Sequence, residues 1–344
     1  MKTLVFNNKE ALIEGWYWLL RADDLRPGQV RAVTLMGREL AIYRGTDGKV
    51  VAMDAYCPHM GAHLAEGRVE GTDLRCFFHH WKYDAQGRCT EIPALGQGCP
   101  SVKARVRTWP VEEQHGLIWL WTGVEARHPV PTVPELQGQQ ADWMLGSRFT
   151  KNCHPNVLLI NAIDEHHFAS VHRLPVPLYM EAREVHENCI EFGNTTRVPQ
   201  TSLFTRFLSR FYRGPLTYAM SYWYGSTGTV TLGPDFLHFH ILFALRPTRE
   251  GRTEGQTILI TKKRPGPGGY LINRVLLRLT QFVGAYFANG DTKVFQTIRF
   301  DLKTPIPADH AILDFIRHTE CQKTAVWLDQ ERPATEPREV PSYG

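Results

Sequence analysis

Two cysteines and two histidines in the first quarter of the chain have the residue types and the spacing of metal ligands. They follow the pattern Cys57-Pro-His59, then sixteen residues, then Cys76-Phe-Phe-His79. From the cysteine and histidine content of this chain, such a pattern arises by chance with a probability of order 10⁻⁴. Thiolates and imidazoles both bind transition metals, so the pattern predicts a metal site.

Two kinds of metal site use two cysteines and two histidines. Structural zinc usually takes like ligands grouped together, as C-x2–4-C and H-x3–5-H. Here each loop supplies one thiolate and one imidazole, which suits a two-iron cluster with both thiolates on one iron and both imidazoles on the other. Gly61 and Gly87 permit tight turns, and Trp81 can shield a cluster from water. His63 and His80 lie off the pattern and are interpreted as surface or packing residues.

The segments DAYCPHMGAHL (54–64) and CFFHHWKY (76–83) resemble the Rieske domain of Rieske non-haem iron oxygenases. The resemblance implies a Rieske-type [2Fe–2S] cluster held by Cys57, His59, Cys76 and His79. The second loop of that family usually reads C-P-Y-H-G-W, whereas Phe77 and His80 stand here in place of the proline and the glycine. Respiratory Rieske proteins join the two loops by a disulfide, which Ala62 and Phe78 cannot form.

A second motif, Asn161-Ala-Ile-Asp164-Glu-His-His167-Phe-Ala-Ser-Val-His172, contains two histidines close to a carboxylate. Two histidines and one carboxylate form the facial triad of non-haem Fe(II) enzymes. The motif resembles the oxygenase pattern N-x2-D-x2-H-x4-H. That resemblance implies that His167 and His172 bind a mononuclear Fe(II), that Asp164 bridges electrons between metal centres, and that Asn161 belongs to the catalytic site.

Helix geometry adds a condition to this site. Residues five apart on an α-helix differ by about 140° in direction. His167 and His172 can therefore bind one metal only where the helix ends, bends or bulges between them. His166 lies six residues before His172, another 100° round the helix, and is off the motif.

The carboxylate of the triad must come from another part of the chain, and Asp291 is the expected ligand. On a helix it shares a face with apolar residues at offsets of three, four and seven, and a buried acid needs a partner or a metal. The family places its third ligand in a similar late helix. Asp301, beside Lys303, is the rival, and its position is typical of a solvated charge.

Further side chains have both a structural and a functional interpretation. His238 and His240 share one face of a predicted strand, where pocket-lining, hydrogen-bonded roles are favoured over metal binding. Two apolar sets are typical of core packing or of the walls of a large cavity: Phe204, Phe207, Leu208 and Phe211 on a helix, and Met220, Tyr222 and Tyr224 on a strand. Four basic residues near the cluster loops could steer an acidic redox partner: Arg68, Arg75, Lys82 and Arg88.

The elements that must position these residues divide into two groups. Short strands are expected over residues 29–34, 39–44, 49–53 and 117–121, followed by a linker over 127–140. After a helix over 156–172, strands are expected over 189–192, 220–224, 227–232, 236–244 and 257–262. A helix follows over 270–300, continuous or broken at Gly290, and the tail after Gln330 is expected to be poorly ordered. This order predicts an α+β chain.

We therefore expect an N-terminal all-β Rieske domain over residues 1–130 and a catalytic domain over 131–344. The second domain would have a curved antiparallel sheet over helices, the helix-grip or START-like arrangement that the resemblance implies.

Composition excludes several other classes of protein. The chain has 344 residues and a net charge of 39 − 35 = +4, without the concentrated basic face of a nucleic-acid binder. It has no apolar stretch that predicts a membrane span and no recognisable secretory signal. Together with seven cysteines, this makes a cytoplasmic location the expectation.

Taken together, the motifs predict a terminal oxygenase that uses O₂, an oxidoreductase of the Rieske type. No G-x-G-x-x-G site follows a strand, so a ferredoxin or flavin reductase must supply electrons from NAD(P)H. The resemblance implies a homotrimer and, through GWYWLLRADDLRPGQVRAVTLMGRELAIYR (15–44), single-component α oxygenases of steroid-oxidising type. A bulky hydrophobic, steroid-like or aromatic substrate would be hydroxylated, demethylated or desaturated. The alternative is a Rieske electron-transfer protein whose second domain is not catalytic.

Overall fold

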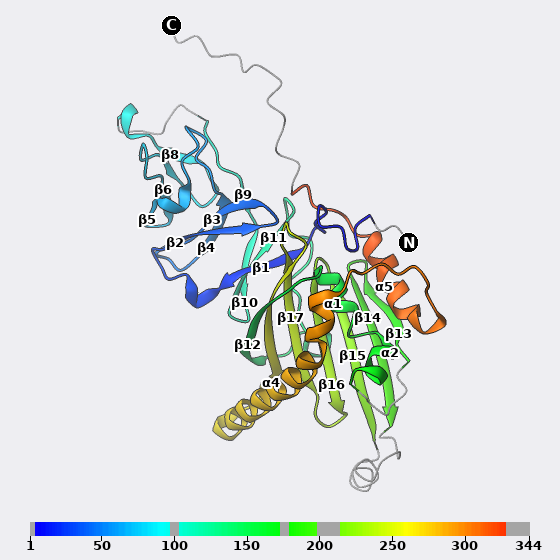
Figure 1. The fold of residues 1–344 in the computed structure, drawn as a ribbon. Coiled ribbons are helices and arrows are strands. Elements are labelled where there is room, and N and C mark those ends of the chain that lie inside the picture. Colours follow the sequence, from blue (N-terminus) through cyan, green and yellow to red (C-terminus); the bar gives the residue numbers. More distant parts are fainter. Residues whose placement is uncertain (1–3, 97–102, 173–178, 198–213, 328–344) are drawn as a thin grey trace.

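The computed structural model describes residues 4–96, 103–172, 179–197 and 214–327. Three small sheets form an N-terminal unit and a seven-stranded sheet forms a second unit, as Figure 1 shows at opposite ends of the molecule. The α+β class expected from the sequence is confirmed. The helical stripe expected at Phe204 to Phe211 and the tail after Gln330 lie outside the described residues.

The N-terminal unit contains eleven of the strands within the described ranges. The first sheet has the order β1-β11-β10, the second β2-β3-β4-β9 and the third β5-β6-β7-β8. The bounds are β1 Trp16–Arg21, β2 Val30–Leu35, β3 Arg38–Arg44, β4 Val50–Asp54, β5 Arg68–Glu70, β6 Asp73–Arg75, β7 Lys82–Tyr83, β8 Cys89–Glu91, β9 Thr108–Trp109, β10 Val111–Gln114 and β11 Leu117–Trp121.

The third small sheet carries the cluster loops. The first loop lies between β4 and β5, and the second loop connects β6 to β7. A core of buried side chains, among them Tyr43, Leu64 and Leu74, packs directly against Cys57 and Cys76. Close packing against this core therefore fixes the positions of both loops.

The second unit is built on an antiparallel sheet in the order β12-β18-β17-β16-β15-β14-β13. Its strands are β12 Ala141–Lys151, β13 Glu181–His186, β14 Cys189–Arg197, β15 Pro215–Trp223, β16 Thr227–Pro234, β17 Phe239–Pro247 and β18 Thr253–Lys262. Strands β12 and β13 are missing from the sequence-based assignment. They form the two edges of the sheet, and half-buried or exposed residues dominate β12, so the apolar pattern that marked the inner strands is weak there.

Four helices accompany this sheet in the described ranges: α1 Pro155–Ile160, α2 Glu165–Ser170, α4 Gly266–Thr297 and α5 His310–Glu320. Figure 1 shows α4 crossing the sheet, where it contacts β12, β17 and β18. Of the two alternatives for this segment, the continuous helix is correct, since α4 passes through Gly290 without a break. None of these helices combines the length and the apolar character that crossing a bilayer requires.

The two units share buried surface. Trp16, Trp119 and Trp121 pack against Ile258 and Ile260 of the large sheet. The expected linker contributes to this core, because Val130, Val133 and Leu136 are buried in the same cluster. The stretch from 127 to 140 therefore packs as part of the fold, although its Pro- and Gln-rich composition is typical of a linker.

The end of the described chain returns to the N-terminal unit. The Trp327 indole nitrogen donates to the Leu35 carbonyl at 2.7 Å, and its ring packs 4.5 Å from that of Trp109. Leu12, Leu25 and Leu40 complete the same buried cluster.

Candidate metal centres

The two cluster loops hold their cysteines inside and their histidines outside. Cys57 and Cys76 are buried at 4% and 2% exposure, whereas His59 and His79 are exposed. The first loop turns tightly because the Gly61 amide donates to the Cys57 carbonyl, and Gly61 has a φ of 76°. The second loop closes where the Cys76 amide donates to the Trp81 carbonyl. This arrangement presents the imidazole end of a bound cluster to the surface.

The four residues form two pairs and not one compact set. The His59 and His79 rings lie 4.6 Å apart, and the two thiols are close enough for Cys57 to help raise the pKa of Cys76, which burial raises most. In the described ranges, no three of the four ligand atoms lie within 4.8 Å of one another. One tetrahedral zinc ion needs all four ligands together, whereas a two-iron cluster needs two pairs. The donor set fits the [2Fe–2S] group.

Two aromatic residues complete this pocket. Trp81 stacks on His59 at 4.3 Å between ring centroids, with an interplanar angle of 9°, which agrees with the shielding expected of it. The Tyr83 hydroxyl lies 3.0 Å from Cys57 Sγ. Burial raises the pKa of Tyr83, and so does the neighbouring Cys57, so the phenol stays protonated and can donate to a thiolate. The sequence analysis missed Tyr83, because its hydroxyl carries no spacing signal.

Arg75 anchors the second loop from inside the protein. Its guanidinium donates to the His80 carbonyl at 2.6 Å and pairs with Glu70 and Glu91 at 2.7 Å each. His80 has a positive φ of 59°, at the position where the family usually has glycine. Arg75 is only 7% exposed. It is therefore a buried loop anchor and not a solvated surface charge.

A second group of ligand atoms lies between α2 and α4. His167 Nε2, His172 Nε2 and Asp291 Oδ1 form a triangle with edges of 2.9, 2.9 and 3.0 Å. Among the described residues, this is the group of three histidine, cysteine or acidic side chains whose ligand atoms are close enough to hold one metal ion. Ligands about 2.1 Å from a metal lie about 3.0 Å apart at 90° and about 3.4 Å apart at 109°. The triangle thus matches one face of an octahedron, the arrangement of a facial triad.

The electrostatics of the triangle also fit a cation. Asp291 is 8% exposed, and its Oδ1 accepts no well-aligned hydrogen bond from the residues that the structure describes. An unsatisfied buried carboxylate is costly without a cation beside it. Burial lowers the pKa of His172 although Asp291 opposes the shift, which keeps that imidazole neutral and able to bind a metal.

The chain folds so that the two histidines can meet. The sequence analysis predicts one helix over 156–172, but the structure has two short helices, α1 and α2, with a turn over residues 161–163 between them. Helix α2 ends at Ser170, between His167 and His172, which is the interruption that the 140° argument requires. Asp164 starts α2, because its carboxylate accepts from the His167 amide at 3.0 Å.

Four further residues pack around the triangle. Asn161 Nδ2 lies 3.0 Å from His167 Nε2, so the motif asparagine does reach the site. Phe168 packs edge-on against Tyr218, whose hydroxyl donates to the Ala162 carbonyl. A Cβ added to Gly290 would lie 3.1 Å from His172 Cε1. The absence of a side chain at Gly290 therefore gives the imidazole its place beside α4.

The remaining candidates lie outside the triangle. Asp301 is exposed and pairs with Lys303 at 3.2 Å, as a solvated charge does. His238 Nδ1 lies 2.7 Å from Glu135, and His240 Nδ1 lies 3.0 Å from Thr231. Both histidines are thus hydrogen-bonded, and neither belongs to a three-ligand group in the described ranges.

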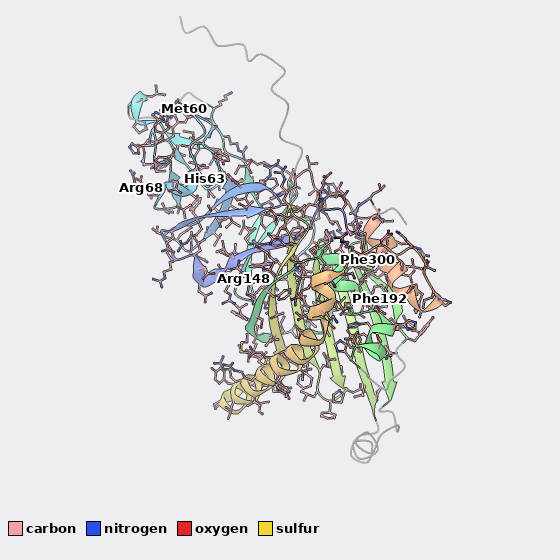
Figure 2. All side chains as sticks on the ribbon, in the orientation of Figure 1. Met60, His63, Arg68, Arg148, Phe192 and Phe300 are labelled. Atoms are coloured by element: carbon pink, nitrogen blue, oxygen red, sulfur yellow. The ribbon has the colours of Figure 1, made fainter. Side chains whose placement is uncertain are left out.

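The apolar strand residues have packing roles in this structure. Met220 and Tyr222 belong to the core beside α1, and the Tyr224 hydroxyl donates to the Pro129 carbonyl. A cleft of about 1000 Å³ lies between the two units, but charged residues such as Arg26, Arg148 and Glu250 line it. Figure 2 labels Arg148 at this junction. The cleft contains no residue of either metal group and does not have the character of an apolar substrate site.

Comparison with known proteins identifies the first of these centres. The family model of the Rieske [2Fe-2S] domain matches residues 15–110. The N-terminal unit is a Rieske domain. The match contains both cluster loops, the anchor Arg75 and Tyr83.

Curated relatives are similar to about half of the chain. The chain is 31% identical over 171 residues to a 3-ketosteroid-9-alpha-monooxygenase oxygenase component of Rhodococcus rhodochrous, covering 48% of this chain and 45% of that protein. It is 37% identical over 171 residues to a 4beta-methylsterol monooxygenase of Methylococcus capsulatus, covering 47% and 46%. The chain thus matches less than half the length of each of these two relatives. The resemblance to Rieske oxygenase components that the motifs indicated is confirmed.

Solved structures share the fold over most of the chain. NdmB of Pseudomonas putida CBB5 aligns with a TM-score of 0.65 at 17% identity, covering 88% of this chain and 89% of its own. Dicamba monooxygenase bound to dicamba aligns with a TM-score of 0.59 at 20% identity, covering 93% and 97%. These alignments therefore show that the fold of the whole chain, with both units, occurs in solved structures.

Proposed function

We propose that this protein is the terminal oxygenase of a Rieske-type system and that His167, His172 and Asp291 hold a mononuclear Fe(II). The observation that carries the proposal is the buried triangle of two imidazoles and one carboxylate, with edges of 2.9–3.0 Å, in a chain with a Rieske domain. When bound, the iron would supply O₂ activation for oxidising a C–H bond. The proposal includes a domain boundary near residue 130.

The protein's own residues would prepare the site in three ways. His167, His172 and the Asp291 carboxylate would hold the metal from one side and would leave its other side for O₂ and substrate. Asn161 lies beside His167 Nε2 at 3.0 Å and offers a polar group at the edge of that open side. Phe168 and Tyr218 exclude water from the other flank.

Electrons would enter the triangle from the Rieske cluster of a neighbouring chain. Within one chain, Met60 of the first cluster loop lies far from Phe192 (Figure 2), which shares a core with Phe168 beside the triangle. His59 and His79 are exposed and can contact another subunit. These observations support a homotrimer in which Asp164, next to the His167 amide, bridges the imidazoles of the two centres. A trimer of this kind is what the resemblance implies.

A reductase or ferredoxin would have to deliver electrons to the exposed end of the cluster. Apolar residues surround that end, with Met60 65%, Phe77 49% and Phe78 50% exposed. Arg68, Lys82 and Arg88 lie nearby, each paired with an acid. The docking surface is therefore more apolar than the sequence analysis expected, and steering by these charges would be weak.

The proposed substrate is a bulky hydrophobic molecule, steroid-like or aromatic. The support comes from the names of relatives, among them the 4beta-methylsterol monooxygenase and a cholesterol 7-desaturase of Bombyx mori. Hydroxylation, demethylation and desaturation all remain within the proposal because they use the same iron. The proposal keeps the cytoplasmic location expected from the cysteine content of the chain.

Metal content tests the proposal and separates it from a pure electron carrier. The wild-type chain should hold about three irons, two in the cluster and one mononuclear, whereas an electron carrier would hold about two. Asp291→Ala should lose the mononuclear iron and substrate oxidation while the cluster spectrum stays unchanged. Asp301→Ala, the matched control at an exposed acid, should keep all three. Two irons in the wild type, or full iron and activity in Asp291→Ala, would refute the assignment.

A further inference from the structure

The N-terminal half of α4 has apolar residues on two opposite faces. Asn273, Leu277 and Thr280 are buried, and Leu277 packs on Ile241 and Leu259 of the sheet. At about 100° per residue, the opposite side of the helix carries an apolar stripe. The residues of this stripe are 44–71% exposed: Leu271, Ile272, Val275, Leu279 and Phe282. A helix that is apolar on both faces is normally covered on both, and no residue that the structure describes covers this stripe.

The charges on the helix and on the segment before it all have one sign, and Asp142 of β12 is the acid in the groove at the start of the helix. From residue 255 to residue 290 the chain has five basic residues and no acidic residue. Arg274 and Arg278 lie along one border of the stripe and are exposed, and Lys262 and Lys263 are exposed just before the helix. Arg264 is held by a hydrogen bond to Asn273 Oδ1 at 2.7 Å. The uncovered surface is therefore apolar and cationic.

Aromatic side chains stand where the helix meets the sheet edge. Trp143 of β12 is 42% exposed and Tyr270 is 58% exposed, and both line a groove of about 170 Å³ together with Arg274. The Arg274 guanidinium lies 5.8 Å from the Tyr270 ring centroid. Tryptophan and tyrosine are favoured at the boundary between water and hydrocarbon because one end of each is apolar and the other polar.

Hydrogen bonds hold the start of α4 firmly against the sheet. Asn273 Nδ2 donates to Asp142 of β12 at 2.7 Å and to the Lys262 carbonyl at 3.1 Å. These bonds fix the start of α4 to both β12 and the end of β18. Figure 1 shows this end of α4 extending past the strands, away from the Rieske domain. The stripe is thus presented outward on a fixed helix.

We propose that this face docks on an anionic lipid surface, with α4 lying flat in the interface and not crossing it. An apolar stripe bordered by arginines, with aromatic anchors at its end, is the pattern of interfacial helices. Anionic headgroups supply the negative charge that residues 255–290 lack. A second copy on the same face would bring two cationic segments together, each with five basic residues, against one acid, Asp142, from each groove. The inference is independent of the proposed oxygenase activity, because it concerns only where the protein sits.

Vesicle binding tests this inference on the intact protein. We expect sedimentation with vesicles of phosphatidylcholine mixed with phosphatidylglycerol, weak binding to pure phosphatidylcholine, and release by salt because screening weakens the attraction. Arg274→Gln with Arg278→Gln should lower the partition coefficient about thirtyfold, since each basic residue at such a surface contributes a factor of about five. Leu271→Ser with Leu279→Ser should lower it at least about tenfold.

Matched controls lie at equally exposed positions elsewhere. Arg26→Gln with Arg31→Gln, and Leu95→Ser with Val124→Ser, should bind as the wild type does. A second measurement needs no substitution on α4: brominated lipids should quench wild-type tryptophan fluorescence, and Trp143→Phe should remove most of the quenching.

Three outcomes would overturn the inference. Equal binding to neutral and anionic vesicles would remove the role of the charges. Wild-type binding by both α4 variants would remove the role of the helix. A change of oligomeric state in the α4 variants, measured by light scattering without lipid, together with no vesicle binding by the wild type, would assign the face to contacts between protein chains.

Discussion

At the scale of single residues, the hydroxyl of Tyr83 is the polar group most directly placed to tune the Rieske cluster. It lies 3.0 Å from Cys57 Sγ inside a core that excludes water. Hydrogen bonds to cluster sulfurs help to set the reduction potential. A donor at this position favours the more negative, reduced cluster.

Tyr83→Phe should therefore lower the potential while the cluster remains assembled. If the lost hydrogen bond favours the reduced state by about 1 kcal/mol, the shift is of order 50 mV, since about 59 mV corresponds to a tenfold change for one electron. Protein-film voltammetry would measure it. Tyr43→Phe, in the same core but bonded to the Thr72 carbonyl, is the control. An unchanged potential in Tyr83→Phe would show that the bond contributes nothing to tuning.

His80 is a second residue whose backbone matters more than its side chain. Its φ of 59° is strained for a residue with a Cβ. Replacing it by glycine relieves this strain but also increases the entropy of the unfolded chain, so His80→Gly should stabilise the protein by a net amount of about 0.5 kcal/mol. His63→Gly should do the opposite, because His63 has a φ of −71° and its imidazole accepts from the Ala65 amide. Denaturant titration compares the two, and destabilisation by both would contradict the argument.

The sequence indicated the proposed metal ligands more clearly than it indicated the residues that support them. Cys57 and His167 carry a strong spacing signal because ligands must be specific residue types at fixed separations. Tyr83, Arg75 and Gly290 act through a hydroxyl, a buried guanidinium and an absent Cβ. Those roles depend on tertiary neighbours, which no local pattern encodes.

At the scale of elements, α2 positions the second metal centre by where it begins and where it ends. It begins at Asp164, which caps it through the His167 amide, and it ends before His172. The sequence analysis predicted one helix here because the segment has few helix breakers. The cap at Asp164 divides it, since aspartate at a helix start competes with continuation of the helix.

Two substitutions at Asp164 should separate capping from charge. Asn caps helices about as well as Asp, so Asp164→Asn should keep the mononuclear iron but slow oxidation of the reduced cluster, because the imidazoles lose an anionic acceptor. Asp164→Ala should also lose the cap, at a cost of about 1 kcal/mol, and should bind iron more weakly. Iron analysis and single-turnover kinetics distinguish them. Wild-type cluster oxidation in Asp164→Asn would rule out the bridging role.

At the scale of the whole molecule, buried neutral histidines link stability to pH. Burial lowers the pKa of His154 to about 4 and the pKa of His240 to about 4, whereas an unfolded histidine titrates near 6.5. Between these values the unfolded chain binds more protons than the folded chain. Stability is therefore fully present above pH 6.5 and falls as the pH drops toward 4.

The fall should be about 1.4 kcal/mol per pH unit for each such histidine below pH 6, measured by denaturant titration. His154→Asn should remove the contribution of one histidine to the slope of unfolding free energy against pH. The cap of α1 should remain, since His154 Nδ1 accepts from the Asn156 amide and asparagine can do the same. An unchanged slope would mean that His154 is protonated in the folded protein.

The contact between Trp327 and Leu35 joins residues 292 positions apart. Because the ribosome makes Leu35 first, this contact forms only after Trp327 has been synthesised. At about 5–20 residues per second, a ribosome needs about 15–60 s to travel from one to the other. During that interval the first sheets exist without the indole that fills their core beside Trp109. The Rieske domain must therefore receive iron and sulfur either while still loose or after the whole chain has emerged. A chain shortened before Trp327 would keep every residue of 15–110 and still carry a cavity in their core.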